Sequence, residues 1–186
     1  MKKVVLILVM ACCMGFVHAQ SEVNQNKLGF GLQVYPAGLI PTAQFIWQLN
    51  DQDAIFLRAG YNLADRKDFS PVNDNEKGGG PGGTIGYKRT WALAKGAFYG
   101  GLQMDIWQMS IDWMDDGETN SPRKGVTDIT VIQPWFDVGY QLPIGRSASA
   151  IFGGLGFGRE INVITKGDEV AQGWMGSLNI GILFAL

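Results

Sequence analysis

Five charged residues lie within stretches where apolar and polar side chains alternate, and they are the first candidates for chemistry. They are Arg58, Lys88, Asp105, Asp137 and Glu160. Alternation places successive side chains on opposite faces of a strand, and each of the five falls on the more polar face. Two cations facing three acids predict a network of ion pairs, since charges taken out of water are costly unless paired. The functional alternative is a narrow ion path or a proton-sensitive gate.

The side chains best suited to covalent or acid–base catalysis are confined to the first nineteen residues. Both cysteines (Cys12, Cys13) and the only histidine (His18) lie there. A start with two lysines, a short apolar core and an A-x-A-like end predict a signal peptide over residues 1–19. A lipoprotein signal ending at Cys12 is the weaker alternative, because Met10 fits a lipobox poorly. The mature chain, residues 20–186, then has no disulfide, no thiolate or imidazole metal site and no Ser–His catalysis.

Two other motifs suggest ligands without completing a site. The acids Asp112, Asp115, Asp116 and Glu118 could hold a divalent cation, but they lack EF-hand spacing and are interpreted as solvated loop residues. The run Gly78–Gly83 is not followed by the Gly-Lys-Ser/Thr of a P-loop and is interpreted as a flexible loop. We therefore expect no metal site, no cofactor site and no catalytic residue.

Charge excludes one class of partner. Loss of Lys2 and Lys3 with the signal lowers the basic side chains from 15 to 13, against 17 acidic ones, a net charge of −4. This balance offers no electrostatic footprint for nucleic acid. No later segment has eighteen consecutive apolar residues, so no transmembrane helix is expected.

The elements that would position the five charged residues are strands. Alternation predicts eight of them, over Lys27–Tyr35, Thr42–Leu49, Ala54–Leu63, Gly83–Trp91, Gly96–Trp113, Thr127–Leu142, Ser147–Ile164 and Trp174–Leu186. In the last strand Leu178 and Ile180 share an apolar face while Asn179 points the other way. Only helices and closed barrels satisfy their backbone inside a bilayer, so the pattern predicts an all-β, eight-stranded antiparallel up-and-down transmembrane barrel. The outer face of the fifth strand turns polar at Gln108, which predicts continuation past the membrane.

The connections alternate in length. Short turns fall near residues 50–53, 92–95 and 143–146, whereas Ala64–Gly82 and Met114–Val126 are long and polar. This asymmetry is typical of outer-membrane barrels, with long loops outside and both termini in the periplasm. Eight strands leave an interior that side chains can fill, so the charged network is interpreted as a structural plug.

With these residues in place, the chain resembles the small outer-membrane β-barrel proteins of Gram-negative bacteria, the porin-like group with OmpA-, OmpX- and OmpW-type barrels. The resemblance rests on the signal peptide, the eight alternating strands and the apolar terminal strand Ile180–Leu186. It implies a location in the cell outer membrane, insertion by the barrel assembly machinery and contact with outer-membrane lipid. The terminal Leu186 departs from the aromatic residue commonest in such barrels, although Phe184 lies two residues earlier on the same face.

The expected function is non-enzymatic. Outer-membrane barrel enzymes depend on a histidine, which the mature chain lacks, so we expect a monomer with a role in envelope structure or surface interaction. The two long loops are the candidate binding surfaces, because loops on a rigid scaffold carry recognition. One alternative is a narrow pore or carrier for small ionic or hydrophobic solutes, as the OmpW resemblance suggests. Another is a secreted soluble barrel that binds a small ligand, with the two faces inverted.

Overall fold

The computed structural model describes residues 26–67, 70, 72–115, 121–145 and 149–186. This part of the chain forms nine strands: β1 (Lys27–Tyr35), β2 (Gly38–Gln48), β3 (Asp53–Asp65), β4 (Asn75–Leu93), β5 (Gly96–Asp115), β6 (Arg123–Pro143), β7 (Ala150–Arg159), β8 (Ile161–Lys166) and β9 (Trp174–Ala185). Within the same residues there is no helix long and apolar enough to cross a membrane. The predicted signal peptide, residues 1–19, lies outside the described residues.

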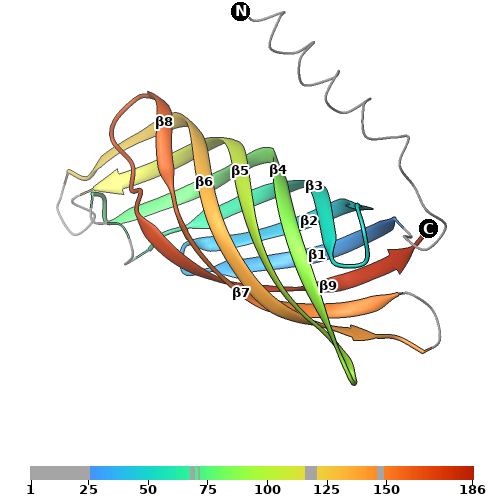
Figure 1. The fold of residues 1–186 in the computed structure, drawn as a ribbon. Helices are drawn as coiled ribbons and strands as arrows, with labels where there is room; N and C mark the ends of the chain where they lie inside the picture. Colours follow the sequence, from blue (N-terminus) through green and yellow to red (C-terminus); the bar gives the residue numbers. More distant parts are fainter. Residues whose placement is uncertain (1–25, 68–69, 71, 116–120, 146–148) are drawn as a thin grey trace, which may run out of the picture.

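The strands close into a ring of eight. Consecutive strands pair antiparallel from β1 to β7, β7 pairs with β9, and β9 pairs with β1. After a break at Glu160, β8 continues along β6, with a register shift at Thr130 and Val131. Figure 1 shows β8 beside β6 and the C-terminus at the same end as the β4–β5 turn. The predicted eight-stranded antiparallel barrel is confirmed, with β7 and β8 together forming the predicted seventh strand.

Five strands, β2 to β6, are longer than predicted, and the extensions of β3, β4, β5 and β6 shorten the two long loops. β4 begins at Asn75 rather than Gly83, β5 ends at Asp115, and β6 begins at Arg123 rather than Thr127. The expected loops Ala64–Gly82 and Met114–Val126 are therefore corrected to residues 66–74 and 116–122. The apolar outer face that marks a membrane strand ends at the membrane boundary. Backbone pairing continues beyond it, because the inner face remains buried.

The run Gly78–Gly83 belongs to β4, so its interpretation as a flexible loop is wrong. Gly80 pairs with Asn62 on β3, and a Cβ atom on Gly80 would lie 1.7 Å from the carbonyl oxygen of Gln108 on β5. Any larger residue would collide with the neighbouring strand. Close approach of two backbones, and not flexibility, requires glycine here.

Most of the outer wall is apolar. Ile85, Leu102 and Leu155 are each more than half exposed, and they belong to a belt that we call the lipid-facing band. Its members include Phe30, Leu57, Ile85, Leu102, Ile106, Phe136, Leu155, Phe157, Leu178 and Ile180. A surface of this kind suits hydrocarbon and would promote aggregation in water. The inner face at the same level is polar, which contradicts the inverted arrangement of a secreted barrel.

Beyond the lipid-facing band the polarity of the wall reverses. On β5 the outward side chains Gln108, Ser110 and Asp112 are polar and exposed. The inward ones are apolar and join a buried cluster, the upper core, of Tyr35, Ile40, Ala64, Trp107, Met109, Ile111, Trp113, Ile129, Val131 and Val170. Trp107 has no exposed surface. This end of the barrel is thus built like a water-soluble barrel, and its interior is filled by side chains.

Candidate functional site

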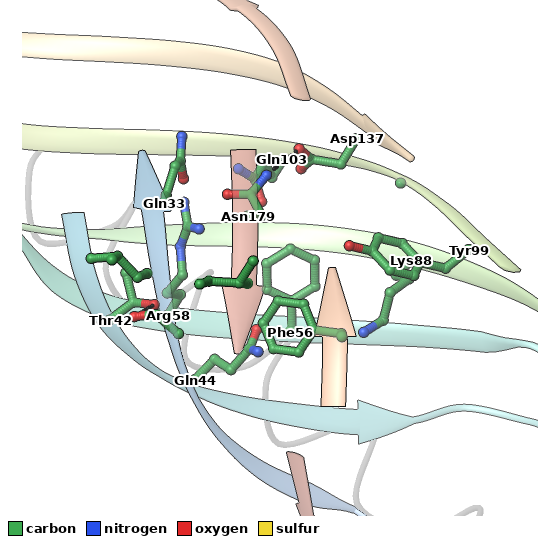
Figure 2. Close-up of a pocket in the computed structure, with 15 residues that line it drawn as sticks. Gln33, Thr42, Gln44, Phe56, Arg58, Lys88, Tyr99, Gln103, Asp137 and Asn179 are labelled. Atoms are coloured by element: carbon green, nitrogen blue, oxygen red, sulfur yellow. Dashed lines mark hydrogen bonds between the residues drawn. The ribbon is translucent and has the colours of Figure 1, made fainter. Parts of the chain in front are cut away.

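The lumen at the level of the lipid-facing band contains four of the five charged residues singled out in the sequence. Arg58 on β3, Lys88 on β4, Asp105 on β5 and Asp137 on β6 all point inward, as the alternation predicts. Figure 2 shows three of them around a small cavity in the lumen. Its volume is about 50 Å³, room for only a few water molecules.

Arg58 and Asp105 form the best-defined ion pair of the lumen. Arg58 Nη2 donates to both carboxylate oxygens of Asp105 at 3.0 Å, and Arg58 Nε donates to Thr84 Oγ1 at 2.9 Å. Asp105 has no exposed surface. The pair ties β3 to β5 across the intervening β4, and the hydrogen bonds offset part of the cost of burying both charges.

Hydrogen bonds extend this pair to the far wall. With its amide oriented to suit both neighbours, Gln103 accepts from Arg58 Nη2 at 3.2 Å and donates to Asp137 Oδ2 at 3.1 Å. Asn179 Nδ2 donates to Asp137 Oδ1 at 3.1 Å. We call these five linked residues the lumen network: Arg58, Asp105, Gln103, Asp137 and Asn179. It braces the barrel from β3 to β9, and Figure 2 shows Gln103, Asp137 and Asn179 side by side.

Lys88 stands apart from the lumen network. Its ammonium nitrogen lies 5.4 Å from the centre of the Tyr99 ring, within reach of a cation–π interaction. In the described part of the chain no carboxylate lies within 4.0 Å of it. Room for Tyr99 comes from β7, two strands along the ring, because a Cβ on Gly154 would lie 2.3 Å from the Tyr99 hydroxyl oxygen.

Glu160 belongs to a different group of charges, above the lipid-facing band. It accepts a hydrogen bond from Arg66 Nη2, and its second oxygen accepts from Gln133 Nε2 at 2.9 Å. Arg66 Nη1 reaches Glu76 at 3.1 Å. Arg66, Glu76 and Glu160 are at least 97 % buried, and we call them the rim network. The expected single cluster of five charges is therefore divided between two levels of the barrel.

Glu76 also fastens two connections to the barrel mouth. It accepts from Ser70 Oγ at 2.8 Å and from Asn73 Nδ2 at 2.9 Å. The backbone N–H of Ala171, between β8 and β9, donates to it at 3.0 Å. Arg66 Nη1 donates to the Ala171 carbonyl at 2.5 Å. The rim network thus holds the β3–β4 and β8–β9 connections over the upper core.

Sequence reasoning missed Arg66 and Glu76 because both fell in the segment interpreted as loop. The signal for Glu76 was present, since it continues the inward phase of Thr84 and Lys88 back through the glycine run. Arg66 lies one residue beyond the end of β3 and continues the inward phase of Asn62 and Ala64. Burial raises the pKa of Glu160, while the Arg66 guanidinium acts in the opposite direction.

The two networks brace the barrel across several strands. Among the described residues no group of three metal-ligating side chains comes together. The expected acid cluster is only partly placed, because Asp116 and Glu118 lie outside the described residues, and Asp112 points outward into solvent. The two networks offer paired charges joined by hydrogen bonds, the chemistry of a polar plug.

Comparison with known proteins agrees with this architecture. No protein-family model and no curated protein sequence matches the chain. Among solved structures, the major outer membrane protein of Thermus thermophilus is 13 % identical, with a TM-score of 0.57 over 89 % of this chain and 100 % of that one. Neisserial surface protein A is 10 % identical, with a TM-score of 0.53 over 88 % of this chain and 96 % of that one. The chain thus has the fold of the small outer-membrane β-barrel proteins.

Proposed function

We propose that the protein is a non-enzymatic outer-membrane barrel with a closed lumen, whose projecting end serves interactions at the cell surface or supports the envelope. One observation carries the proposal: the strands continue past the lipid-facing band, and the upper core fills their interior. A conducting pore would need an open, wet path at this level. A packed interior instead makes the projecting end a rigid scaffold, on which loops can recognise a partner.

Two further observations support a closed lumen. Trp107 Nε1 donates to Gln133 Oε1 at 3.0 Å, and Gln133 in turn bonds Glu160, so the upper core is tied to the rim network. Val170 and Ala171, from the β8–β9 connection, are buried at the mouth. No histidine or cysteine occurs in the described residues, which supports a non-enzymatic role.

Conductance across a planar lipid bilayer tests the closed lumen. The wild-type protein is expected to insert without producing steps of current at neutral pH. Persistent steps in the wild type, altered by Arg58→Ala or Asp137→Asn, would replace this proposal with the pore alternative. Gln48→Ala, at the periplasmic end of β2, is the matched control, because it shortens a side chain that belongs to neither network.

Whole cells test the role of the projecting end. Cells that produce the wild type are compared with cells that produce a variant carrying Gln108→Ala, Ser110→Ala and Asp112→Ala. Retention on immobilised glycans and extracellular-matrix proteins is expected to fall for the variant, with equal surface amounts of barrel. Equal retention together with increased detergent sensitivity of the variant would favour a role in envelope structure instead.

A further inference from the structure

The barrel wall is incomplete on one side of its extracellular end. β7 and β9 pair as far as Arg159 and Trp174, and beyond this point β8 pairs with β6 alone in the described residues. The neighbouring β1–β2 hairpin ends at residues 36–37. Between β8 and this hairpin the wall is therefore made by the connection before β9 and not by a strand.

A cavity of about 310 Å³ lies in this interruption. Its walls include Pro36, Ala37, Trp174 and Met175, which are apolar, and Arg66 and Glu160 reach it from the rim network. Its size is at the lower end of the range for small-molecule sites. The buried charges beside it are already paired with each other, so the cavity favours an apolar occupant over a counter-ion.

Trp174 connects the cavity to the lipid-facing band. It is 67 % exposed, and its ring stacks on Phe157 at 5.2 Å between centres and 7° between planes. Tryptophan is enriched where a membrane protein passes from hydrocarbon to headgroups. A chain entering beside Trp174 would thus come from the bilayer and not from the external solution.

Arg159 adds a charge at the same place. Its guanidinium carbon lies 5.5 Å from the centre of the Trp174 ring, and no ion pair involves it in the described part of the chain. Arginine binds phosphate through charge-assisted hydrogen bonds. An apolar cavity beside an exposed cation matches an amphiphile with an anionic head.

We propose that this side cavity binds one acyl chain of an anionic membrane lipid, with Arg159 holding the lipid phosphate. The site does not depend on a surface-interaction role, and it would remain if the projecting end proved to have a purely structural function. The proposed site at the interrupted wall holds one specific lipid, whereas the lipid-facing band contacts the surrounding lipids without selecting among them.

Native mass spectrometry of the folded barrel with defined lipids tests the proposal. The full mature chain in non-ionic detergent is mixed with phosphatidylglycerol or with phosphatidylcholine. We expect one retained phosphatidylglycerol and about tenfold weaker retention of phosphatidylcholine, because the choline ammonium compensates the charge of the phosphate that Arg159 would hold. Arg159→Gln should reduce phosphatidylglycerol to the level of phosphatidylcholine. Arg123→Gln is the charge control, an exposed arginine that lies over a different tryptophan.

Gly173→Phe tests the cavity itself. Gly173 lines the cavity and a Cβ on it meets no atom within 4 Å, so a ring can be added there without displacing the wall, and retention of both lipids should be lost. Gly153→Phe is the control, because Gly153 is in the outward phase of β7 with Ile151 and Leu155, and the atom nearest to a Cβ there lies 3.9 Å away. Retention unchanged by Gly173→Phe would overturn the proposal, as would equal retention of the two lipids in wild type and Arg159→Gln. Heat-modified gel mobility confirms folding, and Arg159→Gln decides the matter if Gly173→Phe does not fold.

Discussion

Arg66→Met should be among the most destabilising single changes outside the lipid-facing band. The variant keeps an unbranched side chain as far as the position of Nε and removes the guanidinium group with its charge. Arg66 and Glu160 have side chains 3 % and 1 % exposed, so Glu160 would be left as a buried carboxylate with only the Gln133 amide as a donor. Glu76 would keep more of its hydrogen bonds, because Ser70 and Asn73 still donate to it.

The expected cost follows from this difference. Removing one partner of a buried ion pair typically costs roughly 3–5 kcal/mol of unfolding free energy. Because Glu76 retains its neutral donors, most of the penalty should come from Glu160. The double variant Arg66→Met/Glu160→Met removes that stranded charge and should recover most of the loss, since apolar replacements of a buried pair are often close to neutral.

Urea titration in phospholipid vesicles measures both variants, with the heat-modified gel band reporting the folded fraction. A loss below about 1 kcal/mol for Arg66→Met would refute the reasoning, because it would resemble the value of an exposed pair. Failure of the double variant to recover stability would show that Arg66 acts through Glu76 or Ala171 rather than Glu160. Lys77→Met, which removes a largely exposed cation 3.6 Å from Asp65, is the matched control.

The deficit of Arg66→Met should also depend on pH. Burial raises the pKa of Glu160, and Arg66 opposes that rise. Without Arg66 the folded-state pKa of Glu160 should lie further above its unfolded value. A carboxyl group with a raised folded-state pKa has its full cost in stability above that pKa, and the cost declines as the pH falls from there towards the unfolded-state pKa. The deficit should therefore be larger at about pH 8 than at about pH 5, and the double variant should lack this dependence.

Three further changes examine the other levels of the barrel. Trp107→Ala should cost roughly 3–5 kcal/mol by opening a cavity in the upper core, measured by the same urea titration. Gly80→Ala should lower stability by roughly 1–3 kcal/mol through overpacking between strands, whereas Gly173→Ala, into open space, should leave the urea midpoint unchanged. Arg58→Met leaves Asp105 buried without its cation, so the urea midpoint should fall about as much as for Arg66→Met. The variant should still pass no current across a planar bilayer, because the upper core is intact.

Side-chain alternation was enough to predict the strands and their faces. The first strand was predicted with its observed ends, and the inward phase of β3, β5 and β6 agrees with the structure. The reason is local: in a strand every side chain points opposite to its neighbour, so a bilayer outside and a crowded lumen inside mark the sequence at every second residue. Strand ends were predicted less well, because backbone pairing depends on the neighbouring strand.

The glycine run illustrates what a single strand cannot reveal. Glycine is equally expected in a loop and in a strand whose backbone closely approaches another strand. Only the pairing of β4 with β5, which brings Gly80 against the Gln108 carbonyl, decides between them. The same holds for Glu76. The glycines between it and Thr84 interrupt the alternation of apolar and polar side chains, so the inward phase of Glu76 was not recognised.

The candidate sites depended most on the tertiary structure. By itself the sequence determined an all-β barrel with charges on its inner face, because period and polarity are properties of neighbouring residues. It could not determine which charges meet, since Arg66 and Glu160 are 94 residues apart and come together only through the closure and register of the ring. The interrupted wall beside Trp174 has the same origin. It exists because β8 stays with β6 while β9 begins lower down, a fact of strand pairing that the sequence does not record locally.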